Sequence, residues 1–457
     1  MSTERLPVAV IGAGPVGLAA AAHLVAKGAM PLVLEAGPSA GASVLKWGHV
    51  RIFSPWRHNV DRASATLLAA SGWVRPPDDA HPTGLELVER YLAPLAALPA
   101  IRPHLRLRTR VLAVSRMGLD RTKTKSRSDA PFVLRVESGG AHSNVMARAV
   151  IDASGTYESP NPLGANGLPA IGESSLAERL FYGIPDVLGR DRSRYAGHRV
   201  LVVGSGHSAF GVLLDLATLA EDEPGTRVVW AVRRTAIESL FGGGDKDQLE
   251  ERGRLGRRMR DLAHRGTLTI VPGFAISRLE ATPGGIVVSS GSHELEPVDE
   301  VVAATGFRPD VVMLRELRLE LDPIVESPVA LAPLIDPNVH SCGTVPPHGA
   351  EQLRQPEKDF YVVGMKSYGR APTFLMLTGY EQVRSVVCAL TGDWEGARDV
   401  QLVLPETGVC QTDAAYAPAT ACCGTTPEPV GAGCGGDGCS TPVPLSLGPQ
   451  PARQGCC

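Results

Sequence analysis

The stretch VAVIGAGPVGLAAAAHLVAKGAMPLVLE, residues 8–35, carries the strongest structural pattern in this chain. It opens on an apolar β-branched run, passes through a glycine-rich turn into an alanine-rich run, and closes on a second apolar run before an acid. These segments predict a strand, a tight turn, a helix that ends at Gly28, and a second buried strand. This order is typical of the βαβ unit that binds a dinucleotide.

Each residue of the turn has its own part in holding a dinucleotide. Gly12 makes the tight turn, Gly14 lets the backbone approach a pyrophosphate, and Gly17 lets the helix pack closely on the strand. Pro15 completes the turn, and the free N–H groups of the helix start attract the pyrophosphate. Glu35 follows Gly17 by 18 residues, where a carboxylate can accept hydrogen bonds from ribose hydroxyls. We expect FAD or NAD here.

A second unit of this kind lies in the middle of the chain. A strand at residues 199–203 runs into Gly204-Ser205-Gly206-His207-Ser208-Ala209, in which alanine replaces the third glycine, and a helix follows. We expect His207 to contact cofactor phosphates indirectly rather than to act as a base. The strand at residues 227–232 ends in Arg233-Arg234, and arginine can bind a ribose 2′-phosphate. NADPH is therefore expected, NADH stays an alternative, and both arginines could equally form a solvated strand end.

Composition excludes several classes of partner. The 457 residues carry a formal net charge of −3 and a pI near 6.5, so neither nucleic acid nor an anionic membrane is expected as a partner. The N-terminal segment lacks the pattern of a signal peptide, and no apolar run approaches the roughly 20 residues that span a bilayer. We expect a cytoplasmic location with reduced thiols.

Two further segments give the chain a family resemblance. Residues 150–156, which include Gly155, and residues 301–310, which include Thr305 and Gly306, are buried strands that run into small-residue turns. They resemble the ATG-like crossing strands of flavoproteins with two dinucleotide-binding domains. The chain is most similar to NADPH/FAD oxidoreductases of the flavin-containing monooxygenase-like branch, and within them to bacterial flavoproteins associated with arsenic-resistance genes. The segments that carry this closer resemblance are WGHVRIFSPWRHNVD (47–61), YGIPDVLG (182–189), GSGHSAF, ATGFRPD, HSCGTVPPHG (340–349) and YVVGMKSYGRAPTFLMLTGYEQV (361–383).

The resemblance implies an α/β fold with two Rossmann-like domains. The FAD domain is split between residues 1–165 and 301–404, an NAD(P)H domain is inserted at residues 166–300, and a disordered cysteine-rich tail occupies residues 405–457.

The resemblance also assigns residues to the flavin. The loop that contains Trp47, Arg51 and Phe53 lines the flavin, and Gly364-Met365 covers the ring, with the next helix pointing its N-terminus at the pyrimidine end. Phe53 and Trp56 could stack on the ring or belong to the core, and Trp56 is one of two candidate catalytic residues.

The sequence also departs from the patterns of these flavoproteins. Met365 stands where many of them carry an acid after the glycine. In the monooxygenase fingerprint Phe-x-Gly-x-x-x-His, Phe181 and Gly183 are present but Val187 replaces the histidine. No CxxC lies near either glycine turn, where disulfide reductases of this architecture keep their redox pair.

Cys342 is the second candidate catalytic residue. His340 and His348 flank it in a segment rich in turn residues. A thiolate there could bind a soft substrate or act as a nucleophile. The alternative is a buried, inert cysteine.

The last part of the chain has few large apolar residues and many cysteines. Such a composition predicts a mobile arm, because it cannot bury enough surface to offset its ordering entropy. Adjacent thiolates suit soft metals and trivalent metalloids, and the arrangement resembles the C-terminal cysteine pair of mercuric reductases. A zinc site and an inert tail are the alternatives. The candidate metal ligands are Cys422, Cys423, Cys434, Cys439, Cys456 and Cys457.

Three functions are compatible with these features. The first, which we expect, is a monooxygenase that uses FAD, NADPH and O₂ to oxidise a small soft nucleophile, such as a trivalent arsenic or sulfur compound. The second is an NADPH-dependent flavin reductase of a disulfide or soft metal ion that uses the tail cysteines. The third is a thiol-rich metal-sequestering or redox-sensing flavoprotein.

Overall fold

The computed structural model divides the chain into two units, Met1–Ala414 and Ala415–Cys457. The structure describes residues 6–242, 249–338, 345–371 and 374–402, which all belong to the first unit. Cys342 and the six predicted metal ligands of the tail lie outside the described residues.

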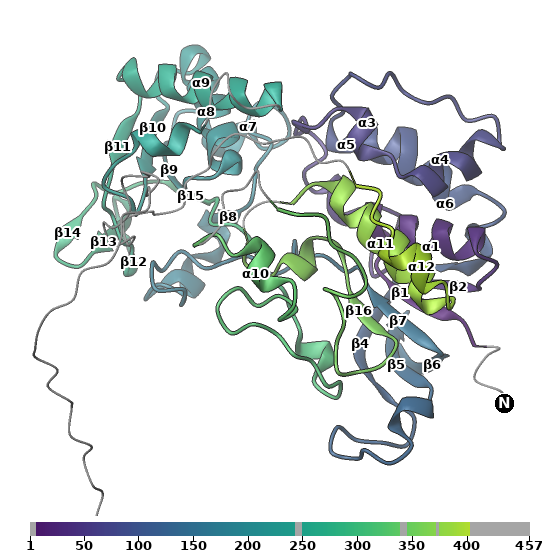
Figure 1. Cartoon of the computed structure of the whole chain (residues 1–457). Coiled ribbons are helices and arrows are strands. Elements are labelled where there is room, and N and C mark those ends of the chain that lie inside the picture. Colours follow the sequence, from purple (N-terminus) through teal and green to yellow (C-terminus); the bar gives the residue numbers. More distant parts are fainter. Residues whose placement is uncertain (1–5, 243–248, 339–344, 372–373, 403–457) are drawn as a thin grey trace, which may run out of the picture. The chain divides into compact units, whose positions relative to one another are not determined.

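A parallel sheet of five strands, in the order β16-β7-β1-β2-β3, contains the first glycine turn (Figure 1). Its strands are β1 (Val8–Ile11), β2 (Pro31–Leu34), β3 (Leu105–Arg106), β7 (Ala149–Asp152) and β16 (Phe360–Val362). In the register of the sheet, Ile11 of β1 lies opposite both Leu34 of β2 and Asp152 of β7. The segments that follow these three strands therefore meet at one edge of the sheet.

A second parallel sheet, in the order β11-β10-β9-β15-β8, contains the second glycine turn. Its strands are β8 (Leu180–Tyr182), β9 (Arg199–Val203), β10 (Arg227–Ala231), β11 (Thr269–Val271) and β15 (Glu300–Ala303). Val203 pairs with Ala231 on one side and with Ala303 on the other. β15 pairs with β9 in this second sheet, so the sheet favours a boundary between the two domains after residue 303. The domain boundaries that the sequence predicts stay predictions.

Two antiparallel sheets complete the strands. One consists of β4 (Thr109–Arg116), β5 (Phe132–Ser138) and β6 (Ala141–Ala147), and the other of β12 (Arg278–Thr282), β13 (Gly285–Ser290) and β14 (His293–Glu294). The connection from β4 to β5 is anchored by Arg127, whose buried guanidinium lies 2.8 Å from the Glu357 carboxylate.

The described residues form twelve α-helices, of which the first and the eighth pack on the strands of the two parallel sheets. They are α1 (Pro15–Ala26), α2 (Ala42–Leu45), α3 (Trp56–Asn59), α4 (Arg62–Ala69), α5 (Gly84–Leu87), α6 (Ala93–Ala97), α7 (Arg192–Tyr195), α8 (His207–Asp222), α9 (Glu250–His264), α10 (Ala332–Ile335), α11 (Met376–Leu390) and α12 (Trp394–Arg398). The predicted α/β class with two parallel sheets is confirmed. Among the helices that the structure describes, none combines the length and the apolar character needed to cross a membrane.

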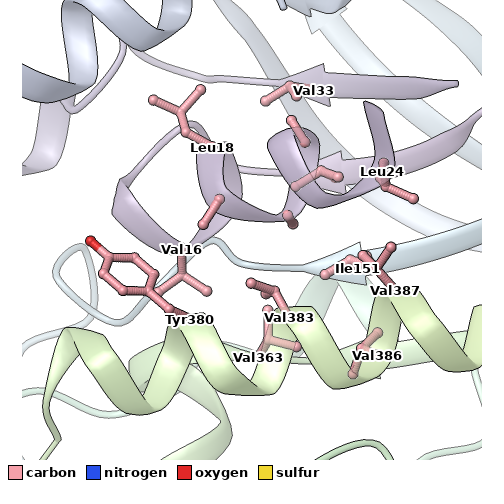
Figure 2. Packing of buried hydrophobic residues seen from close by; sticks show 14 of the residues in the cluster. Val16, Leu18, Leu24, Val33, Ile151, Val363, Tyr380, Val383, Val386 and Val387 are labelled. Carbon is pink, nitrogen blue, oxygen red and sulfur yellow. The ribbon is translucent and has the colours of Figure 1, made fainter. Parts of the chain in front are cut away.

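The packing of α1 against α11 brings two distant parts of the chain together at the first turn. Figure 2 shows Val16 of α1 beside Tyr380 and Val383 of α11. The alanines of α1 favour a helix, and their small side chains allow α11 to pack close to its backbone. A side chain on Gly379 would stand 2.6 Å from Val16 Cγ2, so a glycine is required at this contact. Each buried valine or leucine here stabilises the fold by about 1.5–3 kcal/mol.

Candidate functional site

The first glycine turn can accept only glycine at its two crowded positions. Gly12 has φ +99°, and a side chain on it would stand 2.8 Å from the Ala153 carbonyl oxygen. A Cβ on Gly17 would stand 2.0 Å from the Gly12 carbonyl oxygen. At Gly14, by contrast, no described atom lies within 4 Å of the place that a Cβ would take. The backbone at Gly14 is therefore open to a ligand.

The start of α1 offers a positive end to that ligand. Gly14 is the N-cap, Pro15 occupies the first turn, and no described side chain caps the helix. The first N–H groups of a helix have no partner within it, and together with the helix dipole they attract an anion. Since α1 has 12 residues, its dipole is fully developed. The turn thus has the geometry that a pyrophosphate requires.

Glu35 lies next to this turn, and its carboxylate stabilises the turn in addition to the ribose binding that the sequence predicts. Its carboxylate accepts hydrogen bonds of 2.7 Å from the backbone N–H groups of Ala13 and Gly37. A carboxylate can accept about four hydrogen bonds, so ribose hydroxyls could still donate to it. A cavity of about 420 Å³ adjoins this strand end. It is lined by Ala36, Pro38, Arg108, Arg110, Glu137, Gly139 and Gly140.

The second turn repeats the geometry of the first. Gly204 has φ +133°, and a side chain on it would stand 2.3 Å from the Ala304 carbonyl oxygen. At Gly206, the N-cap of α8, the space for a Cβ is open among the described atoms. Ser205 is exposed, whereas His207 and Ser208 are half-buried at the start of the helix. This turn could also hold a pyrophosphate.

Two arginines follow β10 at the same edge of the second sheet. Arg233 is exposed, and its guanidinium donates a hydrogen bond of 3.1 Å to the Ala165 carbonyl. Arg234 is half-buried. A guanidinium carries five N–H donors, so Arg233 retains donors for a phosphate. The position is compatible with 2′-phosphate recognition, which stays a prediction.

The crossing turns have left-handed glycines. Gly155 has φ +70° and Gly306 has φ +82°. Thr305, which the sequence assigned to the cofactor, uses its hydroxyl to donate a hydrogen bond of 2.6 Å to the Asn161 carbonyl. The Asn161 side-chain amide in turn donates to the Thr305 carbonyl at 3.1 Å. Thr305 therefore joins the two crossing segments.

In the predicted flavin-lining loop, the two residues that could stack on the flavin ring, Phe53 and Trp56, have different environments. Trp56 is only 1% exposed and belongs to the hydrophobic core around α1 and α11. Phe53 is half-buried. Trp47 is also half-buried, with its ring 2.8 Å from the place that a Cβ on Gly84 would take. Arg51 is exposed and donates a hydrogen bond to the His81 carbonyl. Trp56 thus has the environment of a core residue, which is the alternative to stacking on the flavin ring.

Phe53 brings the two dinucleotide units into contact. Its ring centroid lies 5.6 Å from that of His207, the first residue of α8. The guanidinium carbon of Arg252 lies 6.0 Å from the centre of the Phe53 ring. Arg252 is 3% exposed, although it belongs to a helix whose sequence is dominated by charge. Sequence reasoning missed Arg252, because nothing in that charged run distinguishes it from its neighbours.

The segment predicted to cover the flavin ring is held by buried polar groups. Gly364 has φ +69° and donates its N–H to Gln382 Oε1 at 2.7 Å. Met365 is half-buried, and Lys366 is buried beside Asp152 at 2.7 Å. On the far side of Gln382, its amide nitrogen lies 3.0 Å from His348 Nε2.

His348 is a neutral imidazole in this network. Burial lowers its pKa, and its Nδ1 lies 3.1 Å from the Pro346 carbonyl, so Nδ1 carries the proton. Nε2 then accepts from the Gln382 amide. Within the described part of the chain, no group of three or more histidine, cysteine and acidic side chains is arranged to hold a metal ion.

Comparison with known proteins decides which family has this architecture. The family model described as pyridine nucleotide-disulphide oxidoreductase matches residues 9–328, which include both glycine turns. The chain belongs to this family. As a pyridine nucleotide-disulphide oxidoreductase it is an enzyme, and the predicted cofactors FAD and NADP(H) are confirmed as those of the family.

Individual relatives of this oxidoreductase are distant. The ferredoxin–NADP reductase of Salinispora tropica is 27% identical over 326 residues, which form 70% of this chain and 79% of that protein. The bacillithiol disulfide reductase of Bacillus cereus has the same fold, with 17% identity, a TM-score of 0.62, and coverage of 85% of this chain and 99% of that chain. The flavin-containing monooxygenase of Stenotrophomonas maltophilia matches with 23% identity, a TM-score of 0.54, and coverage of 85% and 98%. The predicted resemblance to flavin-dependent oxidoreductases is thus confirmed, and the link to arsenic resistance stays a prediction.

Proposed function

We propose that this oxidoreductase is a monooxygenase that uses NADPH, FAD and O₂ to oxidise a small soft nucleophile. One observation carries the proposal. Two intact dinucleotide turns occur in a chain that has no CxxC near either of them. Disulfide reductases of this architecture keep such a pair near the turns to receive electrons from the flavin, whereas a monooxygenase passes the electrons to O₂ and needs no cysteine pair.

The two turns divide the cofactors between them. FAD binds at Gly12, Gly14, Pro15 and Gly17, where the Glu35 carboxylate can accept hydrogen bonds from its ribose hydroxyls. NADPH binds at the turn of residues 204–208, with Arg233 and Arg234 on the 2′-phosphate. The basis of this division is the kind of residue that follows the second strand of each unit, an acid after β2 and arginines after β10.

The reaction consumes one NADPH and one O₂ for each substrate molecule. FAD, when bound, would supply the transfer of a hydride's two electrons from NADPH to O₂; one oxygen atom goes to the substrate, and the other leaves as water with the hydrogen of the hydride and one proton from solvent. The chain's task is to align the two cofactors and to exclude water. Phe53, half-buried and in contact with His207, connects the flavin-lining loop to the helix that follows the NADPH turn.

The substrate class is a centre that donates a lone pair, such as trivalent arsenic or divalent sulfur. The resemblance of segments 47–61 and 361–383 to arsenic-associated flavoproteins supports arsenic. Cys342 would bind such a soft centre as a thiolate. The tail cysteines would capture it before oxidation.

A panel of substrates tests the proposal. NADPH oxidation and O₂ uptake by the purified flavoprotein are measured with arsenite, methylated arsenicals, thiols and amines, in air and without oxygen. We expect at least one soft nucleophile to accelerate both rates equally, and only in air. Anaerobic NADPH oxidation that requires the tail cysteines would instead identify a reductase, and a protein purified without flavin or NADPH turnover would identify a sequestering or sensing role.

A chain truncated after residue 404 is the matched control. Under the proposal it retains NADPH oxidation and loses only the response to low concentrations of soft ions. Loss of all NADPH oxidation on truncation would contradict the proposal that residues 405–457 act only in the capture of soft ions.

A further inference from the structure

A buried ion pair lies at the edge of the first sheet, outside the groups assigned so far. Lys366 and Asp152 have side chains that are 2% and 0% exposed, and Lys366 Nζ lies 2.7 Å from Asp152 Oδ2. The ammonium also lies 3.1 Å from the Ser154 hydroxyl oxygen. The pair joins the last residue of β7 to the 3₁₀ helix Gly364–Tyr368.

This pair lies directly behind the first glycine turn. Asp152 is opposite Ile11 in the sheet, and the Cβ position of Gly12 is only 3.1 Å from Ser154 Cα. On the other side, the Cβ position of Gly364 is 3.3 Å from Val16 Cγ2 in the first turn of α1. Both segments that hold the ammonium therefore contact the turn that we assign to FAD.

Packing alone does not explain a lysine at this position. Removing an ammonium and a carboxylate from water is costly, and an apolar pair of similar size is often as stable or more stable. Asp152 is engaged through both oxygens, because Oδ2 accepts from Lys366 and Oδ1 accepts from the Ser154 N–H at 3.1 Å and from the Ser154 hydroxyl at 2.6 Å. The ammonium has three N–H bonds, and the described residues supply two acceptors for it.

We propose that Lys366 is a cofactor-binding residue that donates its third N–H to an oxygen of FAD. The acceptor is a phosphate oxygen or a ribityl hydroxyl, since both are oxygen acceptors in a dinucleotide that crosses this edge. Asp152 and Ser154 are positioning residues that hold the ammonium in place. Lys366 thereby supplies a polar contact in a segment where Met365 offers none. The inference rests on the assignment of FAD to the first turn.

The test separates a contact with FAD from a purely structural ion pair. Full-length Lys366→Met, Asp152→Asn and the double variant are freed of flavin, and the FAD dissociation constant and the melting temperature of each apoprotein are measured. We expect both single variants to melt at lower temperature, because each leaves a buried group without its partner. In the double variant, which buries no charge, the apoprotein melts near the wild-type temperature and still binds FAD at least about tenfold more weakly.

Two further measurements complete the design. Lys27→Met, which removes the exposed 2.7 Å pair of Lys27 with Asp393, is the control and keeps wild-type FAD affinity. The affinity of the double variant for ADP then locates the acceptor. If the acceptor is a phosphate oxygen, the affinities for ADP and FAD both fall. If the acceptor is a ribityl hydroxyl, which ADP lacks, the affinity for ADP stays unchanged. If neither single variant folds, the double variant decides alone.

Wild-type FAD affinity in the double variant would overturn the role of Lys366. Such a result would leave the assignment of FAD to the first turn intact. A wild-type protein that binds no FAD, or whose FAD affinity is insensitive to change at Gly14, would instead refute that assignment.

Discussion

The ring of Phe53 lies 5.6 Å from the imidazole of His207, at a tilt of 46°. This contact connects the loop after the first βαβ unit to the first residue of the helix after the second glycine turn. In a flavoprotein that takes hydride from NADPH, the two cofactors must approach each other between these units. The contact is therefore the place where the chain can control their alignment.

Phe53→Ala should slow flavin reduction by NADPH several-fold, because an aromatic pair contributes about 0.5–1.5 kcal/mol beyond burial. Stopped-flow absorbance at the flavin band measures the rate. Phe53→Leu keeps most of the apolar volume, so its rate of flavin reduction should lie between those of wild type and Phe53→Ala. If Phe53→Ala reduces as fast as wild type, the ring has no part in alignment.

Cofactor preference should depend on the arginines after β10. Replacing both Arg233 and Arg234 by alanine removes the donors for a 2′-phosphate, so the KM for NADPH should rise at least about tenfold while the KM for NADH changes little. Arg227→Ala, an exposed change at the start of the same strand, is the matched control. An equal rise for both nicotinamides would show that the arginines do not read the 2′-phosphate.

The two kinds of glycine in the first turn should respond differently to alanine. Gly17→Ala places a Cβ 2.0 Å from a carbonyl oxygen, so the apoprotein should melt at much lower temperature or fail to fold. Gly14→Ala meets no described atom and should leave the apoprotein melting temperature nearly unchanged, while FAD affinity falls because the backbone can no longer approach the pyrophosphate. Equal FAD affinity in Gly14→Ala and wild type would exclude this turn as the FAD site.

Stability should depend on pH through Asp215 in α8. Burial raises the pKa of this carboxyl from 3.8 to about 6, so the folded chain holds its proton to higher pH than the unfolded chain does. Its contribution to folding is fully present below pH 3.8 and is lost as pH rises to about 6. Asp215→Asn should therefore raise the melting temperature at pH 7.5 by a few degrees and leave it unchanged near pH 4.

Asp222→Asn provides the comparison for Asp215, since it changes an exposed carboxylate of the same helix. This variant should shift the melting temperature by less than about 1 °C at either pH. If Asp215→Asn is no more stable than Asp222→Asn at pH 7.5, burial does not act on the Asp215 carboxyl as described.

The βαβ units could be predicted because their signals are local. The strand predicted at residues 199–203 is observed as β9 with the same bounds, and the helix predicted to end at Gly28 ends at Ala26. The glycine spacing follows from contacts within one turn of chain. These patterns predict the strands beside each glycine turn, but not the outer strands β3, β8 and β11.

The rest of the site depends on contacts between distant residues, for which a single sequence has no signal. Lys366 meets Asp152 across 214 residues, and a lysine in sequence is usually exposed. Arg252 is buried in a helix of charged residues. In sequence, Phe53 and Trp56 are both candidates to stack on the flavin ring, and only the packing around α1 and α11 shows that the core encloses Trp56.

The transfer of oxygen from isotopically labelled O₂ tests the proposed monooxygenase most directly. The purified flavoprotein is mixed with NADPH, labelled O₂ and the soft nucleophile that best stimulates O₂ uptake, and the product is analysed by mass spectrometry. We expect one labelled oxygen atom in the product for each NADPH consumed. An unlabelled product, or NADPH consumption that continues at the same rate without O₂, would contradict it.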